Sequence, residues 1–281
     1  MSVRFTEEYK KAGAALSLEV SDIVANVRSP FQNIQVVQSP FFGKVLLIDG
    51  CVMLTERDEF VYHEMIVHVP LYSHPAPQRI LVIGGGDGGT VREIIKHPQV
   101  EQVDLVDIDK AVSDVCLQHI PSVASKLLSA KVSCYYEDGV KFVKNSPEKY
   151  DVVLIDSTDP INVGEGLFTS GFYRDCFGLL NKDGILVNQA ESPFYTPEWV
   201  GSISGKLSEI FPHLFFYQAH IPTYPSGHWL FGFASKKPHP LTEFQEKRFQ
   251  ADRLNLKYYN AEVHRAAFAL PNFVRELVEK A

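Results

Sequence analysis

A glycine-rich segment at residues 84–89, with the sequence GGGDGG, constrains the fold of this chain more than any other feature. It directly follows an apolar run over residues 79–83 and directly precedes a helical pattern over residues 90–97. Gly84, Gly86 and Gly89 match the pattern G-x-G-x-x-G, which in a strand–loop–helix context is typical of a nucleotide-binding βαβ unit. The segment therefore predicts a ligand site where the first strand of a parallel sheet meets a helix N-terminus.

Apolar runs and helical patterns continue to alternate after the glycine-rich segment. Further strands are expected at 103–108, 132–136, 151–155 and 185–188, and further helices at 111–119, 140–144, 171–180 and 197–210. This alternation predicts a parallel sheet with helices on both faces, and the nearly continuous apolar runs fit strands that are buried on both sides. We therefore predict an α/β, Rossmann-like fold of the methyltransferase type with a mostly parallel sheet.

The first part of the chain has a different pattern. Short, partly alternating runs at 16–27, 34–38, 44–49 and 51–55 predict β-hairpins, and Asp49-Gly50 is a hairpin-turn signal. A helix is expected at 59–69, followed by a loop from Pro70 to Pro77. We predict a small N-terminal β domain over residues 1–77 and a Rossmann-like catalytic domain over residues 78–281.

The composition limits the partners and the compartment. The formal net charge of −7 argues against nucleic acid or an anionic membrane as a partner. The four cysteines form no CxxC pair, so neither a zinc site nor a disulfide framework is expected. The N-terminus lacks the apolar core of a signal peptide, and prolines interrupt the uncharged stretch at 210–235, so no transmembrane helix is expected. These features predict a cytoplasmic protein with reduced thiols.

Asp87, inside the glycine-rich segment, bears on the charge of the ligand. A carboxylate there would repel the pyrophosphate of a dinucleotide and would attract an ammonium or a sulfonium group. We therefore expect an adenosyl ligand that carries positive charge. An NAD-dependent dehydrogenase, which the glycine pattern alone would allow, is disfavoured for the same reason.

Further acidic residues follow the next two predicted strands. Asp107 lies about 20 residues after the glycine-rich segment, at the spacing expected for a carboxylate that binds ribose hydroxyls. Asp109 is then expected to cap the following helix. Asp138, followed by Gly139, either accepts a hydrogen bond from an adenine amino group or caps a helix. Because ligands bind at the carboxyl ends of parallel strands, we expect Asp107 and Asp138 to face one site.

The segment 156–160, with the sequence DSTDP, places Asp156 and Asp159 just after another buried strand. Together with Asp87 they predict a negative pocket that binds a polyvalent cation, either organic or metallic. A metal is disfavoured, because the segment is not an EF-hand loop and no phosphate cradle accompanies it. His63 and His68 are five residues apart, whereas the zinc-binding helix of metalloproteases needs a spacing of four. We expect neither a metal nor a bound cofactor.

Several motifs, spread in order over nearly the whole chain, resemble the spermidine synthases, the polyamine aminopropyltransferase family. They are YHEM, GGGDGG, the strand end at Asp107, EDG, DSTDP, LFTSGFY, IPTYPSG, KYYN and HRAAFALP. The resemblance implies transfer of the aminopropyl group of decarboxylated S-adenosylmethionine to putrescine, which gives spermidine and methylthioadenosine. It also implies a homodimer or a homotetramer.

The resemblance implies roles for individual residues as well. On the donor side, the matching positions are Gln32, Gly84, Gly86, Asp87, Asp107, Asp138, Gly139 and Val163. On the amine side, they are Tyr62, His63, Asp87, Asp156, Asp159 and Tyr224. Asp156 matches the family's proton acceptor and is the expected catalytic residue.

One segment departs from the family pattern. The family usually continues the acidic segment as DPxGPAxxLF or DPxGPGxxLF, whereas Asn162 and Val163 follow it here. The resemblance implies that this segment covers the active site. Because the segment differs here, the sequence does not determine which amine is the acceptor. The alternatives are an aminopropyltransferase for a different amine, an amine N-methyltransferase that uses S-adenosylmethionine, and a non-catalytic polyamine-binding protein, which Asp156 disfavours.

Overall fold

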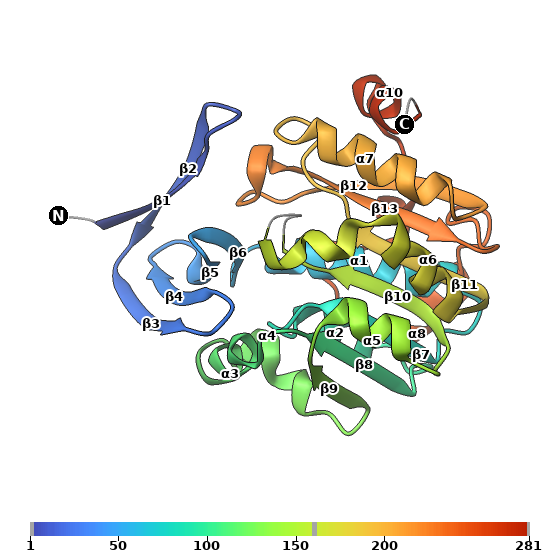
Figure 1. Ribbon diagram of the computed structural model, residues 1–281, viewed down its shortest axis with the longest axis horizontal. Helices are drawn as coiled ribbons and strands as arrows, with labels where there is room; N and C mark the ends of the chain where they lie inside the picture. The colour runs from blue at the N-terminus through green and yellow to red at the C-terminus, as the bar shows by residue number, and fades with distance from the viewer. Residues whose placement is uncertain (1–2, 159–161, 280–281) are drawn as a thin grey trace.

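The computed structural model describes residues 3–158 and 162–279 and contains a seven-stranded sheet in the order β12-β13-β11-β10-β7-β8-β9 (Figure 1). The strands are β7 (Arg79–Gly84), β8 (Gln102–Asp107), β9 (Val132–Tyr136), β10 (Tyr150–Asp156), β11 (Leu180–Gln189), β12 (His213–His220) and β13 (His228–Ser235). The neighbours from β11 to β9 pair in parallel, and β13 runs antiparallel to both of its neighbours. The predicted Rossmann-like, mostly parallel sheet is confirmed.

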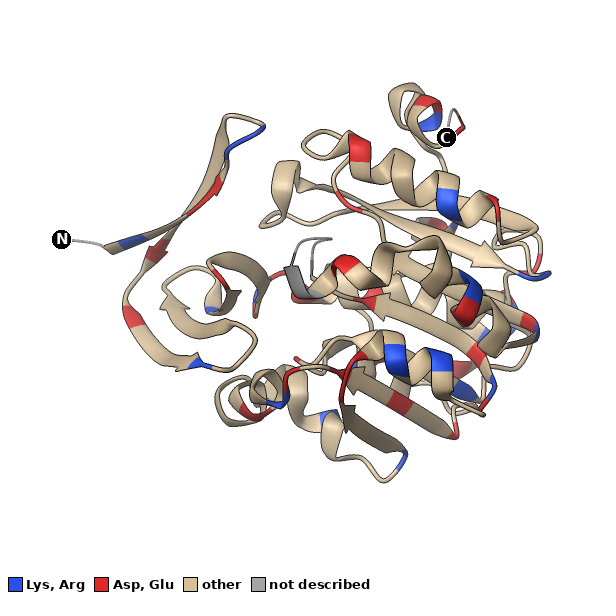
Figure 2. Cartoon of the chain, in the orientation of Figure 1, with Lys and Arg blue, Asp and Glu red and all other residues tan. Residues whose placement is uncertain are grey.

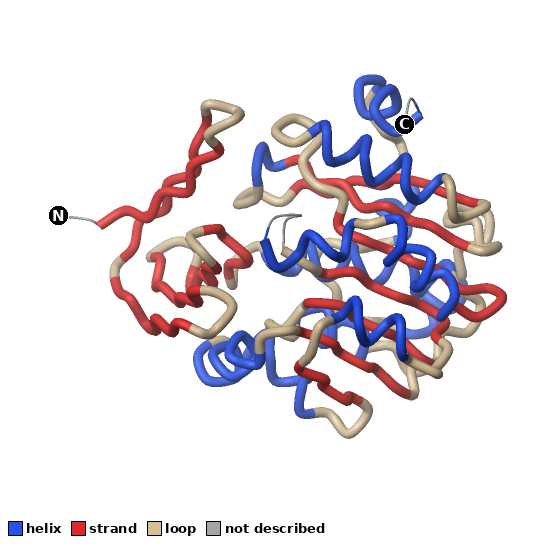
Figure 3. Tube along the Cα trace, viewed as in Figure 1, coloured by secondary structure: helices blue, strands red, loops and turns tan. Residues whose placement is uncertain are grey.

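Helices cover both faces of this sheet (Figure 3). The α-helices are α1 (Glu59–Ser73), α2 (Gly89–Ile95), α3 (Lys110–His119), α4 (Pro121–Ala124), α5 (Gly139–Asn145), α6 (Ser170–Leu179), α7 (Pro197–Ser208), α8 (Glu246–Asp252), α9 (Ala261–Ala266) and α10 (Asn272–Glu279). Three 3₁₀ helices are η1 (Ser125–Leu128), η2 (Asn162–Phe168) and η3 (Pro225–Gly227).

Alternate residues of the central strands enter two separate apolar cores. Val82 and Leu154 pack with residues of α1, α2 and α3, whereas Leu81 and Val153 pack with residues of α5, α6 and α7. Strands β12 and β13 carry no Lys, Arg, Asp or Glu (Figure 2). Burial of both faces explains why the central strands β7, β8 and β10 are nearly continuous apolar runs in the sequence.

The N-terminal part is built from antiparallel strands. Strands β1 (Val3–Tyr9) and β2 (Ala14–Val20) form a two-stranded sheet, and β3 (Asp22–Arg28), β4 (Asn33–Ser39), β5 (Gly43–Ile48) and β6 (Cys51–Thr55) form a four-stranded sheet. Asp49 and Gly50 both have positive φ angles in the turn between β5 and β6, as a two-residue hairpin of the predicted kind requires.

Several local predictions were wrong or incomplete. The run at 16–27 is divided at Ser21 between two sheets, and strand β1 was not predicted. Helix α1 continues through Pro70 to Ser73, where the sequence suggested a loop, because all of its residues from Val61 onward are buried by tertiary packing. Leu180, expected at the end of a helix, begins β11.

The uncharged stretch at 210–235 contains the whole of β12 and β13 and no α-helix. Within residues 3–158 and 162–279, no helix is both long enough and apolar enough to cross a membrane. The domain boundary near residue 77 stays a prediction. Helix α1, which precedes it in the chain, lies against α2 and the large sheet and so links the two parts.

Candidate active site

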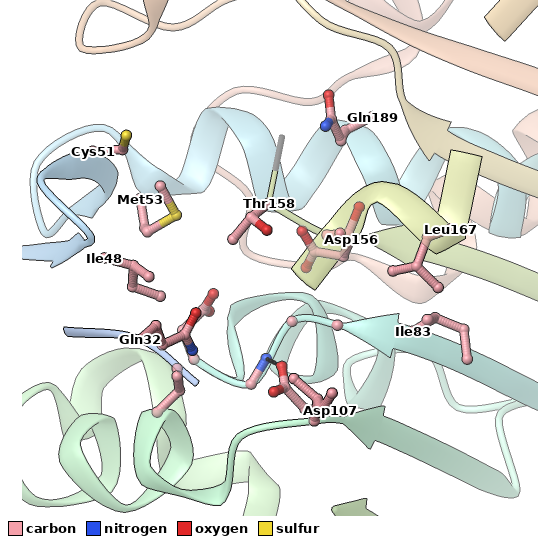
Figure 4. Close-up of a pocket in the computed structure, with 18 of the residues that line it drawn as sticks. Gln32, Ile48, Cys51, Met53, Ile83, Asp107, Asp156, Thr158, Leu167 and Gln189 are labelled. Carbon is pink, nitrogen blue, oxygen red and sulfur yellow. Dashed lines mark hydrogen bonds between the residues drawn. The ribbon is translucent and has the colours of Figure 1, made fainter. Parts of the chain in front are cut away.

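A pocket lies where the carboxyl ends of β7, β8 and β10 approach the N-terminal sheet. Gly84, Asp107 and Asp156 end these three strands and line the pocket. Figure 4 shows Ile48, Cys51 and Met53 on one side of the space, and Asp156, Leu167 and Ile83 on the other. The pocket therefore depends on both parts of the chain.

Most of the residues selected from the sequence meet in this pocket. They are Gln32, Tyr62, His63, Gly84, Gly86, Asp87, Asp107, Asp138, Gly139, Asp156 and Tyr224. Asp159 lies outside the described residues. Val163 lies in η2, but its side chain also lies outside the description. The grouping of the described residues fits one ligand site, although their individual roles stay predictions.

The glycine-rich segment passes close to the end of β10, which explains its composition. Gly84 has a φ of 80°, in the left-handed region that favours glycine. A Cβ atom at this position would lie 2.2 Å from the backbone oxygen of Asp156. The absence of a side chain therefore allows the segment to lie directly beside Asp156.

Asp107 is held by backbone N–H groups on both of its oxygens. The amide of Gly86 donates to Oδ2 at 3.0 Å, and the amide of Asp109 donates to Oδ1 at 2.8 Å. Burial raises the pKa of Asp107 to about 6. The charges of Asp109 and Asp87 also raise this pKa, whereas the two backbone hydrogen bonds lower it. Asp109 caps α3 by accepting from the amide of Ala111, as predicted.

Asp138 caps helix α5, which is one of the two roles that the sequence left open. Its Oδ1 accepts hydrogen bonds from the amides of Val140 at 2.9 Å and Lys141 at 3.4 Å. The side chain is 39% exposed and lines the pocket. Capping and ligand binding are therefore compatible at this residue.

Asp156 accepts two short hydrogen bonds from hydroxyl groups. Tyr62 donates to Oδ1 at 2.7 Å, and Thr90, which sequence reasoning missed, donates to Oδ2 at 2.6 Å. Burial, followed by the charge of Asp87, raises the pKa of Asp156 above its usual value. Burial and the nearby Asp156 also raise the pKa of Tyr62, so the phenol stays protonated and donates. This arrangement orients a carboxylate whose proton affinity is increased, as a general base requires.

Asp87 lies between the glycine-rich segment and His63. Its Oδ1 accepts from the amide of Gly89 at 2.7 Å and lies 3.5 Å from Nε2 of His63. Burial alone would raise the pKa of Asp87, but the interaction with His63 outweighs it and holds this pKa below its usual value. Asp87 is therefore ionised at neutral pH.

Aromatic side chains form one wall of the pocket. The ring centroids of Tyr62 and Tyr224 are 5.7 Å apart, and those of Tyr224 and Trp229 are 4.9 Å apart. The hydroxyl of Tyr224 donates to the backbone oxygen of Met53 at 2.8 Å, which fixes this wall to the N-terminal sheet. Such aromatic faces suit the methylene chain and the ammonium groups of an alkyl diamine.

Sequence reasoning missed many pocket residues, and they come from both parts of the chain. They are Glu7, Leu46, Ile48, Cys51, Val52, Met53, Ile83, Gly85, Val106, Ile108, Val112, Val140, Ser157, Thr158, Gly164, Leu167, Gln189, Pro225 and Trp229. Most are ordinary strand residues in the sequence. Gly85, Ser157, Thr158, Leu167 and Pro225 lie inside sequence motifs and so carried a local signal.

Comparison with known proteins places this geometry in a family. The family model described as "Spermine/spermidine synthase domain" matches residues 59–246, and the one described as "Spermidine synthase tetramerisation domain" matches residues 3–56. The chain belongs to the spermidine synthase family. It is thus an aminopropyltransferase of polyamine biosynthesis, as the motifs indicated.

Curated relatives agree over the full length. A polyamine aminopropyltransferase of Alkaliphilus oremlandii is 48% identical over 100% of this chain and 99% of that relative. One from Clostridium perfringens is 50% identical over 99% of both chains. These relatives support the assignment of the whole chain, and not of one domain alone, to the family.

Solved structures confirm the fold. A spermidine synthase in complex with the transition-state analogue AdoDATO superposes with a TM-score of 0.97 at 36% identity, over 99% of this chain and 96% of that one. Spermidine synthase from Thermotoga maritima superposes with a TM-score of 0.95 at 36% identity, over 99% and 95% of the two chains. The N-terminal β region and the Rossmann-like domain are thus both features of the family.

Proposed function

We propose that this aminopropyltransferase uses decarboxylated S-adenosylmethionine as the donor and putrescine as the acceptor, and releases methylthioadenosine and spermidine. The observation that carries the proposal is the charge of the pocket. Its described lining residues include Glu7, Asp87, Asp107, Asp138 and Asp156, but no Lys or Arg. Such a pocket suits a sulfonium donor with an ammonium tail and a diamine acceptor, both of which are cations.

The donor would lie along the carboxyl ends of the parallel strands. Asp107 would accept hydrogen bonds from the ribose hydroxyls, while Gln32, Asp138 and Gly139 would surround the base. The backbone of Gly84 and Gly86 allows close approach of the donor, and Val163, whose side chain lies outside the description, is proposed to contact the donor as well. Asp87 would bind the ammonium of the aminopropyl group. Intact S-adenosylmethionine carries a carboxylate that Asp87 would repel, which gives selectivity by repulsion as well as by attraction.

The reaction is a displacement at the carbon next to sulfur. The lone pair of the amine nitrogen forms the new C–N bond while the C–S bond breaks, and the sulfonium becomes a neutral thioether. The amine must first lose a proton, because an alkylammonium with a pKa of about 10.4 is mostly protonated at neutral pH. Asp156 would accept this proton while Tyr62 and Thr90 fix its carboxylate.

The acceptor would lie against the aromatic wall. Tyr62 and Tyr224 would contact its methylene chain, and Asp159, outside the described residues, would bind one of its ammonium groups. His63 lies on this side, but both of its ring nitrogens face carboxylates. Its effect on the amine is therefore exerted through Asp87. No metal or bound cofactor takes part, because a sulfonium is already a good leaving group.

We also propose that the protein acts as a cytoplasmic homodimer or homotetramer that assembles through its N-terminal part. The hairpin β1–β2 extends away from the large sheet in Figure 1. Val3, Ile23 and Phe41 in this part expose 67%, 61% and 60% of their surface, and this part matches the family model described as a tetramerisation domain. Light scattering on the purified protein should show a dimer or a tetramer, and a monomer would contradict the assignment.

Product analysis tests the proposed reaction. The protein is incubated with putrescine and either decarboxylated or intact S-adenosylmethionine, and the products are identified by mass spectrometry. We expect spermidine and methylthioadenosine from the decarboxylated donor alone. N-methylputrescine from the intact donor would indicate a methyltransferase, and turnover only with a longer amine would indicate a different aminopropyl acceptor.

A further inference from the structure

A buried chain of charged groups extends from Asp87 away from the pocket. His63 presents Nε2 to Asp87 Oδ1 at 3.5 Å, and its Nδ1 lies 2.6 Å from Oε2 of Glu59. The guanidinium of Arg92 donates to both oxygens of Glu59, with Nη1 2.9 Å from Oε1 and Nη2 2.8 Å from Oε2. The side chains of His63, Glu59 and Arg92 are 4%, 6% and 15% exposed, so water screens these contacts only weakly.

The position of the ring between two carboxylates favours a doubly protonated imidazole. A neutral imidazole donates from one nitrogen only and would direct the lone pair of the other toward a carboxylate oxygen. An imidazolium donates to both. Gly89 lies directly against the ring, because a Cβ atom at that position would lie 2.2 Å from Cε1 of His63. The N–H of the same Gly89 binds Asp87 Oδ1, so one residue fixes both the ring and the carboxylate.

The positive charge of His63 keeps Asp87 ionised in the pocket. Asp87 lies near Asp107 and Asp156, and carboxylates that share a buried site tend to take up a proton. Burial also acts against a charged His63, yet hydrogen bonds and charge from Asp87 and Glu59 raise the pKa of His63 to about 10. Burial likewise opposes the charge on Glu59, but His63 and Arg92 lower its pKa to about 2. The charge of Asp87 therefore depends on His63, that of His63 on Glu59, and that of Glu59 on Arg92.

We propose that Glu59 and Arg92 are positioning residues, which hold His63 as an imidazolium so that Asp87 stays ionised and fixed for the aminopropyl group of the donor. The catalytic part of this inference rests on the proposed function. The titratable and charged groups that face His63 and Asp87 are Glu59 and Tyr62 from α1, Arg92 from α2, Asp107 from β8, Cys116 from α3 and Asp156 from β10.

The first test follows His63 directly by NMR of the labelled ring nitrogens, and it needs no turnover. In the wild type, we expect both ring nitrogens to remain protonated up to at least pH 8. In Glu59→Gln, the pKa of His63 should fall by at least about one unit, a tenfold change in proton affinity. A wild-type His63 that titrates near 6.5, or one that Glu59→Gln leaves unchanged, would overturn the proposal.

Glu64→Gln is the matched control. Glu64 is a second buried carboxylate on α1, and it accepts the backbone N–H groups of Lys257, Tyr258 and Tyr259 instead of contacting His63. This variant removes a buried charge from the same helix and should leave the titration of His63 in place. An equal shift in both variants would show that the effect comes from a disturbed helix, and the proposal would fail.

The second test measures kcat/KM for decarboxylated S-adenosylmethionine between pH 6 and pH 8.5. Without Glu59, His63 loses its proton at a lower pH and no longer holds Asp87, so Glu59→Gln should lose a larger fraction of its activity at pH 8.5 than at pH 6, mainly through KM for the donor. Arg92→Lys keeps a cation beside Glu59 and should show a smaller shift in the same direction. A loss of equal size at every pH would mean that Glu59 only supports the fold. If the wild type transfers no aminopropyl group, the proposed function fails, and the NMR titration alone decides the role of Glu59.

Discussion

Asp156 shows how single hydroxyl groups prepare a carboxylate for catalysis. Its two oxygens accept from Tyr62 at 2.7 Å and from Thr90 at 2.6 Å, which fixes the rotamer. Burial and the charge of Asp87 raise its pKa above the usual value. A carboxylate with these properties holds a proton better than a solvated one does.

Replacement of Asp156 by Asn tests this role. The amide keeps the size of the side chain but removes the basic oxygen, so we expect kcat to fall by roughly 10²–10⁴. Affinity for methylthioadenosine should change little, because Asp156 lies on the amine side. Higher pH should partly restore the rate, since it supplies free amine. Single-turnover rates at several pH values measure these effects, and a nearly wild-type chemical step would refute the role of general base.

Asp107 gives a second prediction at the scale of one residue. Asp107→Ala should weaken methylthioadenosine binding by about 1.5–3 kcal/mol, the range for hydrogen bonds to a charged group. Since the pKa of Asp107 is about 6, wild-type affinity should also fall as the pH drops below 6, where the carboxylate becomes protonated. Calorimetry from pH 5 to pH 8 measures both effects. Affinity that is independent of both the residue and the pH would exclude Asp107 from the ribose site.

The sequence allowed the prediction of residues that carry a local signal. Asp87, Asp107 and Asp156 are recognisable because each is acidic and follows or interrupts a strand–loop–helix pattern. Glu59 and Arg92 carry no such signal, since charged residues on a helix normally face solvent. Their burial depends on the contact between α1 and α2, which only the tertiary structure shows.

At the scale of elements, hydrophobic periodicity identified the part of the fold in which strands and helices alternate. It failed for elements whose formation depends on tertiary contacts. The strands β7, β8 and β10 are confirmed because burial on both faces produces apolar runs. The edge strand β9 is also confirmed, although its residues are only partly buried or exposed. Strand β1 has the charged sequence VRFTEEY and pairs only with β2, so its sequence shows little apolar character. Helix α1 passes through Pro70 because packing outweighs the loss of one backbone hydrogen bond.

The contact between α1 and α2 also predicts a pH-dependent contribution to stability. Glu93 of α2 is 1% exposed and pairs with His68, Arg92 and Lys96. Burial opposes its charge, but these partners hold its pKa well below 4.5. The contribution of Glu93 to the free energy of unfolding is therefore fully present above pH 4.5. It is lost as the pH falls toward the lower pKa that Glu93 has in the folded state.

Glu93→Gln should lower the free energy of unfolding at pH 7 by about 3–5 kcal/mol, because it removes the negative charge that pairs with these buried partners. Urea denaturation at pH 7 and at pH 3.5 measures this loss, which should be smaller at the lower pH. Asp183→Asn is the control. Asp183 pairs with Lys237 at 3.1 Å, with side chains 27% and 62% exposed, and should contribute about 1 kcal/mol or less. Equal losses in both variants would contradict the account of the buried cluster.

At the scale of the whole molecule, the two parts of the chain complete one acidic pocket. Gln32 and Met53 come from the N-terminal part, and Asp107 and Asp156 come from the Rossmann-like part (Figure 4). The sequence indicated both parts but not their contact, because the residues that meet are distant along the chain. This explains why the pocket residues of the N-terminal strands other than Gln32, such as Ile48 and Met53, were missed.

The chemistry of this pocket predicts independence from metal ions. The proposed sulfonium donor would leave as a neutral thioether and would need no electrophilic assistance. His63 and His68, which resemble a zinc motif in the sequence, face Glu59 and Glu93 respectively. Activity should therefore survive exhaustive chelation in a steady-state assay. A loss that added magnesium reverses would show that the acidic residues hold a metal.

The central claim is that the negative charge of the pocket selects the aminopropyl cation, and calorimetry on Asp87→Asn tests it most directly. The variant keeps the shape of the side chain and removes its charge. Binding of decarboxylated S-adenosylmethionine should weaken much more than binding of methylthioadenosine, which has the same nucleoside but lacks the aminopropyl cation. Equal losses for the two ligands would show that Asp87 only shapes the glycine-rich segment, and would contradict the account.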